Sequence, residues 1–531
     1  MTIWPTAATA AVRRETHFGN RVVRCYADRP RGADRLLAEA AARAPDAEAL
    51  VDGDLRLTYG ELHRRVDAVA GNLAAAGLER GDRLALYLEN RAQAVLAFLA
   101  GVRLGAVAVP LGARYRAREL AHALALTRPK VLVHEAALAE FLPRDGLPRR
   151  RFAVAGDAHG AAPFAALETT ATAPAGAPAE DDAVAIMFTS GTTGLPKGAV
   201  WTHLGLVHSV LQFERCWRLG PGERTILAAP WSHAIGIGAV IMTMARVAGC
   251  VVVQRRFQAA EFLRLAAAEG LTYAALAPAM YHLCVRDPAF AGADLRHWRV
   301  GGFGGAPMPE ALIAELAAAL PGLTLVNAYG ATETTAPPVL MPLGHTAAHA
   351  GSVGRVVPCG ELLVMDEDGR EAPPGAPGEI WFRGPTVVPG YWRGEGAESF
   401  VGGWWRSGDI GTVDGDGYVR VLDRQKDMLI RGGLKVFSAE VEAALADHPD
   451  ITECAIVGRP DPVLGERVHA VVVSPAGGPD LAALRAWCAG RLADYKIPES
   501  AEVRAEPLPR NASGKVQKNL LRAALDGPGH S

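Results

Sequence analysis

Helical and strand-type hydrophobic patterns alternate over residues 34–110. Residues 58–61 read Thr-Tyr-Gly-Glu, the pattern of a helix capping box, and apolar residues recur at helical spacing after it. A short apolar run at 83–88 is typical of a buried strand, and it is followed by a helical pattern at about 92–104 and a second strand at 106–109. A strand, a helix and a strand in this order predict a parallel sheet with helices on its faces.

The pattern of predicted helices and strands changes after about residue 350. Before it, further strands of the same kind are expected around residues 131–134, 183–188, 226–229, 251–254 and 323–327. After it, helical patterns thin out, and short strands separated by Gly, Pro and Asp turns indicate a small β-rich subdomain, at residues 360–365, 378–383, 411–413 and 418–422. From about 427 the pattern is that of a compact α+β domain, with helices at 438–446 and 480–492. Residues 171–182 are expected to form a surface linker.

Composition excludes several classes of protein. A chain of 531 residues is too long for one hydrophobic core, so two or more domains are expected. Its net charge of −2 gives no support for a nucleic-acid partner or a polybasic membrane anchor. The most apolar stretch, 225–253, is interrupted by polar residues and glycines, which favours a buried core segment over a stable membrane insertion.

The number and spacing of the cysteines indicate the cellular compartment of the protein. Seven cysteines are scattered without a Cys-x-x-Cys pair, which favours reduced thiols over a disulfide framework or a zinc site. Residues 1–14 lack the apolar core of a signal peptide. We therefore expect a cytoplasmic protein.

The most informative motif is residues 188–198, Phe-Thr-Ser-Gly-Thr-Thr-Gly-Leu-Pro-Lys-Gly. Glycines expose backbone N–H groups, hydroxyls add donors, and a lysine adds a mobile positive charge, so the run suits a polyphosphate. It departs from a Walker A loop because Pro196 replaces the second glycine and Gly198 stands where Ser or Thr would bind magnesium. A surface loop is the alternative for the motif taken alone.

Four other polar clusters follow. Residues 327–334 (Asn-Ala-Tyr-Gly-Ala-Thr-Glu-Thr) come directly after a predicted strand, at the edge where open α/β sheets bind ligands. A strand-end turn with a solvated Glu is the alternative for this run alone. Residues 301–308 are rich in glycine and could form a flat wall for a planar base, with a simple turn as the alternative. Residues 403–411 place Asp409 in an expected tight loop, where its carboxylate could accept hydrogen bonds from a ribose diol, with an Asp in an ordinary β-turn as the alternative. Charged residues at 423–427 and a basic segment at 510–518 could be a hinge and a reaching lysine, or only a solvated linker and tail.

In this order and spacing, the set resembles the adenylate-forming superfamily, which includes acyl-CoA synthetases, aryl-CoA ligases, luciferases and nonribosomal adenylation domains. The resemblance covers about residues 35–520. It implies an α/β fold with a large N-terminal domain of two α/β subdomains plus a β-rich subdomain, followed by a small mobile α+β C-terminal domain. The implied boundaries are residues 1–423 for the adenylation domain, 424–427 for the hinge and 428–531 for the C-terminal domain.

The resemblance also implies roles for individual residues. For the nucleotide, it assigns the β- and γ-phosphates to Thr189, Ser190, Gly191, Thr192, Thr193, Gly194 and Lys197, the adenine wall to Gly304, Gly305, Ala306 and Pro307, adenine stacking to Tyr329, and the ribose to Asp409 and Arg424. For catalysis, it assigns an α-phosphate contact to Thr332, a magnesium ligand to Glu333, and the lysine between the substrate carboxylate and the α-phosphate to Lys515. It makes Lys426 the hinge residue and assigns CoA binding to Gly432, Gly433 and Lys435.

The implied acid pocket is apolar. His233 stands where amino-acid-activating members carry an Asp, so a zwitterionic substrate would leave its ammonium unpaired. His233 is expected to gate the pocket, with a structural role as the alternative. The other expected pocket residues are mostly small, which favours a medium- or long-chain fatty acid over the alternative of an aromatic acid: Ala234, Ile235, Gly236, Phe303 and Ala331, with Ile237 and residues 336–339 beside them.

The expected reaction needs ATP and CoA as co-substrates and Mg²⁺ as cofactor. A carrier-protein thiol, an amine acceptor and a non-catalytic nucleotide-binding protein are the alternatives. The expected partners are small molecules only, and we also consider a homodimer.

Overall fold

The structure is a computed structural model, and it describes residues 3–9, 11–174, 178–189, 196–335, 337–474, 477–510 and 515–525. Its chain forms two compact units. The first consists of residues 1–362, 382–405 and 417–419, and the second of residues 363–381, 406–416 and 420–531. The expected domain boundaries at 423 and 428 stay a prediction. Among the described residues, no helix has both the length and the apolar character needed to cross a membrane.

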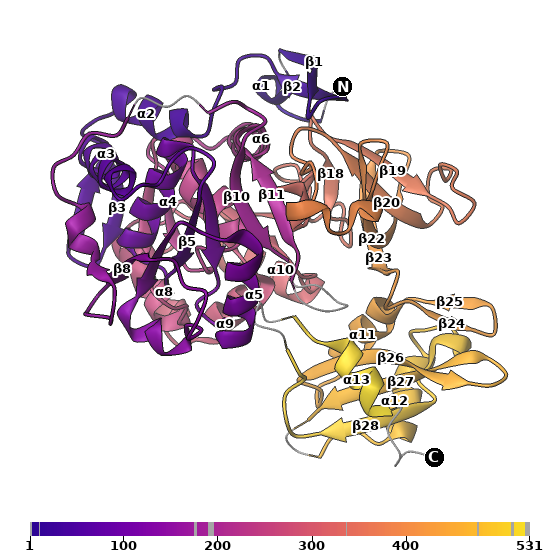
Figure 1. Cartoon of the computed structure of the whole chain (residues 1–531). Helices are drawn as coiled ribbons and strands as arrows, with labels where there is room; N and C mark the ends of the chain where they lie inside the picture. The colour runs from indigo at the N-terminus through magenta and orange to yellow at the C-terminus, as the bar shows by residue number, and fades with distance from the viewer. Residues whose placement is uncertain are drawn as a thin grey trace. The chain divides into compact units, whose positions relative to one another are not determined.

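The first α/β layer confirms the alternating pattern. Its sheet has the order β11-β10-β6-β5-β7-β8-β9, and neighbours are parallel except the β10–β11 hairpin. Helix α4 packs on β5 and β6, and α3 packs on α4 (Figure 1). The elements of this layer are α3 (Tyr59–Ala75), β5 (Arg83–Tyr87), α4 (Ala92–Leu104), β6 (Val107–Leu111), α5 (Ala117–Thr127), β7 (Val131–Glu135), β8 (Arg150–Val154), β9 (Ala162–Pro163), β10 (Ala183–Phe188), β11 (Gly198–Thr202) and α6 (His203–Cys216).

The capping box has the predicted geometry. Thr58 Oγ1 accepts a hydrogen bond from the Glu61 backbone N–H, and the Glu61 carboxylate accepts one from the Thr58 N–H. The expected linker is only partly exposed, because Ala173 is buried and residues 171–172 lie against Gly71 of α3. That part of the linker therefore packs on the domain and does not run free over its surface.

A second sheet has the order β12-β13-β3-β4. A third contains the parallel strands β14, β15 and β16, which β17 and β18 continue in antiparallel pairing. The expected core segment at 225–253 is largely buried and includes a π-helix, η3 (Ile235–Met242). These elements are α2 (Asp34–Arg43), β3 (Glu48–Asp52), β4 (Leu55–Thr58), β12 (Arg224–Leu227), α7 (Thr243–Val247), β13 (Cys250–Val253), α8 (Ala259–Ala268), β14 (Tyr273–Leu276), α9 (Pro278–Arg286), β15 (Val300–Gly304), α10 (Glu310–Ala319), β16 (Thr324–Tyr329), β17 (Val339–Leu340) and β18 (Gly354–Val356).

The sequence patterns did not predict the N-terminal hairpin. It follows the short helix α1 (Thr6–Thr9) and consists of β1 (Val12–His17) and β2 (Arg21–Tyr26), paired antiparallel. Its polar strands show no clear alternation, and tertiary contacts described below hold it in place.

The second unit contains most of the β-rich region and the α+β tail. Its C-terminal sheet has the order β25-β24-β27-β26, with β28 parallel to β27. Strands β20, β22 and β23 each contain residues of both units. The elements are β19 (Glu361–Met365), β20 (Gly378–Arg383), β21 (Phe400–Val401, in the first unit), β22 (Trp404–Val413), β23 (Tyr418–Arg424), β24 (Leu429–Arg431), β25 (Leu434–Val436), α11 (Ser438–Ala446), β26 (Glu453–Asp461), β27 (Gly465–Val473), α12 (Leu481–Ala489), β28 (Ser500–Arg504) and α13 (Lys518–Leu525).

Candidate active site

The turn after β16 carries Thr332 and Glu333 on a short 3₁₀ helix, η5 (Thr332–Thr334). The Trp201 indole N–H of β11 donates a 2.8 Å hydrogen bond to the Thr332 carbonyl. The Thr334 hydroxyl accepts a hydrogen bond from the Ala331 N–H. These contacts fix the turn at the carboxyl end of a parallel strand, as the sequence predicts for a ligand site.

Glu333 is bound by Tyr391, a tyrosine that no sequence motif marks. The Tyr391 phenol donates a 2.6 Å hydrogen bond to Glu333 Oε1, and the Val388 N–H donates one to the Glu333 carbonyl. Burial, with the Glu333 charge adding to it, raises the pKa of Tyr391 well above its usual range. The phenol therefore stays protonated as a donor.

The same tyrosine lies beside Lys197. The Lys197 ammonium is 5.2 Å from the Tyr391 ring centroid and 3.8 Å from Glu398 Oε1. The Thr189 N–H donates to the Lys197 carbonyl at the loop end of the β10–β11 hairpin. Ser190, Gly191, Thr192, Thr193 and Gly194 lie outside the described residues. Of the expected phosphate and metal groups, the structure thus brings Lys197 and Glu333 together around one aromatic ring.

The N-terminal hairpin supports this arrangement. The Arg21 guanidinium donates hydrogen bonds to the backbone carbonyls of Val387, Val388 and Pro389, the residues that lead to Tyr391. No local sequence signal marks Arg21, because its partners lie more than 360 residues away.

The expected adenine wall begins at the end of β15. Gly304 pairs with Ala328 of β16, and a Cβ on Gly304 would lie 2.3 Å from the Ala328 carbonyl oxygen. Gly305 has φ +80°, a conformation that favours glycine. Ala306 and Pro307 continue as exposed loop, and Tyr329 ends the neighbouring strand β16. The strand ends therefore place Gly304, Gly305 and Tyr329 at the same edge of the sheet.

The segment with His233 leads into the π-helix. Trp231 is anchored by hydrogen bonds to Asn90 Oδ1 and the Leu88 carbonyl. A Cβ on Gly236 would lie 2.5 Å from the Trp231 Cα, so only glycine fits there. Of the other expected pocket residues, His233, Ala234, Ile235 and Ala331 are half-buried, Gly236 and Ile237 are buried, and Phe303 is buried in an apolar cluster with Leu276 and Met308.

The expected ribose contacts lie in the second unit. Arg424 Nε is 3.0 Å from Asp409 Oδ1, and the Gln425 N–H donates to the Gly408 carbonyl. Asp409 lies inside strand β22 and not in a tight loop. The expectation of a tight loop was wrong because Trp404 and Trp405 favour strand pairing over the turn that the glycines suggest.

The expected hinge is held by α13. Arg522 donates hydrogen bonds to the Lys426 carbonyl and to Asp427 Oδ1. Burial lowers the pKa of Lys426, and nearby arginines and Lys515 add to this effect.

Gly432 and Gly433 form a two-residue hairpin turn between β24 and β25. Both have positive φ, +57° and +82°, which matches the turn that suits the twist of paired strands. Lys435, two residues later, pairs with Glu367 at 2.9 Å. Lys515 is exposed.

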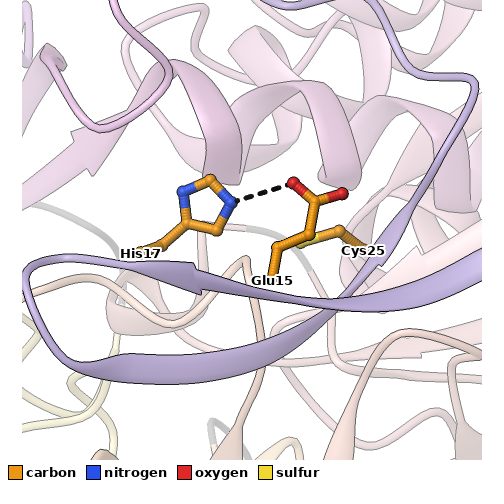
Figure 2. A group of neighbouring side chains, drawn as sticks. All are labelled: Glu15, His17 and Cys25. Carbon is orange, nitrogen blue, oxygen red and sulfur yellow. Dashed lines mark ion pairs between the residues drawn. The ribbon is translucent and has the colours of Figure 1, made fainter.

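A separate group of chemically active side chains lies on the N-terminal hairpin (Figure 2). Ligand atoms of Glu15, His17 and Cys25 lie within 4.8 Å of one another. The buried Arg29 binds both Glu15 oxygens, however, and His17 Nδ1 lies 2.7 Å from Asp181 Oδ1. Since a guanidinium already neutralises the carboxylate, we interpret the group as an ion-pair network that fastens the hairpin to Asp181.

Comparisons with known proteins agree with this geometry. A family model for AMP-binding enzymes matches residues 37–392, and one for the C-terminal domain of AMP-binding enzymes matches residues 440–515. The chain is 38% identical to a feruloyl-CoA synthase from Amycolatopsis sp. over 90% of this chain and 96% of that protein. It is 32% identical to the long-chain-fatty-acid–CoA ligase FadD13 of Mycobacterium tuberculosis over 92% of this chain and 97% of that protein.

A solved structure is similar over the same span. The O-succinylbenzoate coenzyme A synthetase MenE of Bacillus subtilis, in complex with ATP and a magnesium ion, matches with a TM-score of 0.81 and 28% identity. The match covers 93% of this chain and 99% of that one. The resemblance inferred from the motifs is thereby confirmed, and the chain belongs to the AMP-binding enzyme family.

Proposed function

We propose that the protein is an ATP-dependent acid–CoA ligase. It adenylates a lipophilic carboxylic acid with release of pyrophosphate and then transfers the acyl group to CoA with release of AMP. The observation that carries the proposal is the placement of Lys197 and Glu333 around Tyr391, because a cation and a carboxylate at one strand edge suit a metal-bound polyphosphate. The relatives named above, a feruloyl-CoA synthase and a long-chain-fatty-acid–CoA ligase, support the same class of reaction.

The residues present fit Mg²⁺. Magnesium prefers hard oxygen ligands and usually takes only one or two carboxylates, with water and phosphate oxygens completing its shell. Glu333 supplies such a carboxylate, and Tyr391 fixes one of its oxygens. When bound, Mg²⁺ would neutralise charge on the phosphates.

In the first step, a carboxylate oxygen of the acid attacks the α-phosphorus, and the bond to the β-phosphate oxygen breaks. Lys197 is proposed to hold the β- and γ-phosphates, and Thr332 to contact the α-phosphate. Lys515 is proposed to bridge the two anions as they meet, since a lysine ammonium offers a mobile positive charge. Gly304, Gly305, Ala306, Pro307 and Tyr329 are proposed to hold the adenine, and Asp409 and Arg424 the ribose.

In the second step, the CoA thiol attacks the acyl carbon, and AMP leaves. Lys515 serves only the first step, so the C-terminal domain is proposed to turn about Lys426 between the two. Gly432, Gly433 and Lys435 are then proposed to contact CoA. Substrates of this kind agree with the cytoplasmic location expected from the cysteine pattern, and a homodimer stays a prediction.

The acid is proposed to enter beside His233. The segment offers no carboxylate to an ammonium group, which supports an uncharged acyl body. A medium- or long-chain fatty acid and an aromatic acid both remain within this proposal.

A pyrophosphate-release assay tests the function. Purified protein is mixed with ATP, Mg²⁺ and one acid from a set of straight-chain acids, benzoates and cinnamates, each with and without CoA. Release that rises with CoA for one class of acid is the expected result. Release that ignores CoA would indicate a carrier protein or an amine as acceptor, and no release with any acid would contradict the proposal.

A further inference from the structure

Helix α6 carries polar side chains in a fully buried setting. Ser209 and Gln212 are 0% and 1% exposed, and they lie three residues apart on one face of the helix. Within the described part of the chain, Ser209 Oγ and both amide atoms of Gln212 have no hydrogen-bond partner. Buried polar atoms normally have hydrogen-bond partners, so two neighbouring buried side chains without partners need an explanation.

The helix begins beside the turn that carries Glu333. Thr335 follows this turn, is 1% exposed and has φ +53°, which is strained for a β-branched residue. A Cβ on Gly205 of α6 would lie 3.0 Å from Thr335 Oγ1, another buried hydroxyl without a partner in the described chain. The N-terminal part of α6 therefore adjoins the expected phosphate and metal residues.

The middle of α6 faces the π-helix of the expected acid pocket. A Cβ on Gly238 would lie 3.4 Å from Ser209 Oγ and 3.9 Å from the Thr335 carbonyl oxygen. The missing side chain of Gly238 thus leaves room next to the Ser209 hydroxyl.

The far end of α6 reaches strand β15 at Gly302. Trp217 ends the helix, and a Cβ on Gly302 would lie 3.0 Å from its ring. Gln212 lies between these two ends, about 10 Å along the helix from Gly205 at the usual rise per residue. An acid whose carboxylate lies near Glu333 would span this distance with one aromatic ring and a short linker.

We propose that Ser209 and Gln212 bind a hydrogen-bonding group, such as a phenolic hydroxyl, at the end of the acid opposite its carboxylate. The proposal rests on the proposed function and names its substrate class. A hydroxyl both donates and accepts, and the serine hydroxyl and the glutamine amide offer both complements. A plain alkyl chain would leave all three polar atoms unpaired, as they are in the free protein, and would gain none of these hydrogen bonds.

The test compares two acids that differ by one hydroxyl. With ATP, Mg²⁺ and CoA, kcat/KM is measured for 4-hydroxycinnamate, cinnamate and octanoate. A site built to bind a hydroxyl rejects the analogue that lacks it, so we expect 4-hydroxycinnamate to be preferred over cinnamate by about 100-fold or more. Octanoate should be no better than cinnamate.

Two variants test whether this preference depends on the side chains of α6. In Gln212→Leu and Ser209→Ala, the preference for 4-hydroxycinnamate over cinnamate should fall at least about tenfold, because kcat/KM falls more for the hydroxylated acid than for cinnamate. Ser474→Ala is the matched control, because Ser474 is also a buried serine without a partner in the described chain but lies in the second unit. Its preference should equal that of the wild type.

A thermal melt of each variant without substrate separates binding from a structural role. Removing an unpaired buried polar group should leave the melting temperature unchanged or raise it. If Gln212→Leu fails to fold, Ser209→Ala, which removes a single oxygen atom, carries the test. Equal kcat/KM for the two cinnamates in the wild type, or a preference that survives both variants, would overturn the inference and leave the ligase function standing. Absence of CoA-dependent turnover with every acid would overturn the proposed function itself.

Discussion

Tyr391 binds the carboxylate of Glu333 through a 2.6 Å hydrogen bond that spans 58 positions of sequence. The residues just before Tyr391 add a second contact, from the Val388 N–H to the Glu333 carbonyl. Arg21 of the N-terminal hairpin in turn holds the carbonyls of Val387, Val388 and Pro389. The orientation of the proposed metal ligand therefore depends on residues outside its own motif.

Replacing Tyr391 with phenylalanine should weaken the use of magnesium. The ring remains to pack beside Lys197, but Glu333 loses the donor that orients its carboxylate. Groups that orient a metal ligand typically contribute 10- to 100-fold, so we expect adenylation at limiting Mg²⁺ to fall about tenfold and to recover at high Mg²⁺. Pyrophosphate release against Mg²⁺ concentration measures this effect.

Tyr87→Phe is the control for that measurement. Its phenol also donates to a fixed acceptor, the Tyr115 carbonyl, but it lies on β5 and outside the candidate site. An unchanged Mg²⁺ dependence in Tyr391→Phe would show that the hydrogen bond has no part in metal use.

Elements with strong local signals could be predicted from the sequence. The capping box at 58–61 and the helix at 92–104 follow from side chains that contact residues three or four positions away. The contact between Tyr391 and Glu333 could not be predicted in this way, because it depends on how β11, η5 and residues 388–391 pack in three dimensions. The N-terminal hairpin was missed for the same reason.

The residues of the candidate site also differ in whether the sequence predicts them. Glycines such as Gly304 and Gly432 can be recognised in the sequence, because they stand in glycine-rich runs between predicted elements. Ser209 and Gln212 lie on a mostly apolar helix, and no sequence motif marks them. A helix with one polar face usually turns that face to solvent, and only the structure shows that this face is buried.

Lys515→Ala should separate the two half-reactions. Removing a cation that meets the developing charge typically costs about 100- to 1000-fold, and we expect this loss in adenylation alone. Thioester formation from supplied acyl-adenylate and CoA should change far less. Lys130→Ala, which removes an exposed lysine paired with Asp82, is the control, and equal losses in both half-reactions would contradict the role of Lys515.

Gly304→Ala should damage the strand edge that carries the adenine wall. The new methyl group would lie 2.3 Å from the Ala328 carbonyl oxygen, a backbone atom that cannot turn away. We expect a loss of about 1–3 kcal/mol in the free energy of unfolding, together with weaker ATP binding. Gly322→Ala should be neutral by comparison, since no atom lies within 4 Å of its added Cβ. Similar urea midpoints for the two variants would contradict the proposed constraint.

Stability should fall as the pH drops below neutral, in part through His203. Burial lowers the pKa of His203 to about 4, so the folded protein keeps this ring neutral where the unfolded chain, with a pKa near 6.5, takes up a proton. The contribution of the neutral His203 ring to the free energy of unfolding is complete above about pH 6.5. Roughly 2 kcal/mol of this contribution should be lost by pH 5.

The variant His203→Asn tests this assignment. An asparagine can still accept the hydrogen bond that the Ala33 N–H donates to His203 Nδ1, but it does not titrate. Urea unfolding at pH 7, 6 and 5 should therefore show a shallower loss of stability in His203→Asn than in the wild type. Parallel pH slopes would mean that His203 takes up its proton with the same pKa in both states, and the loss would then have to come from other groups, such as the buried His208, whose pKa burial lowers to about 3.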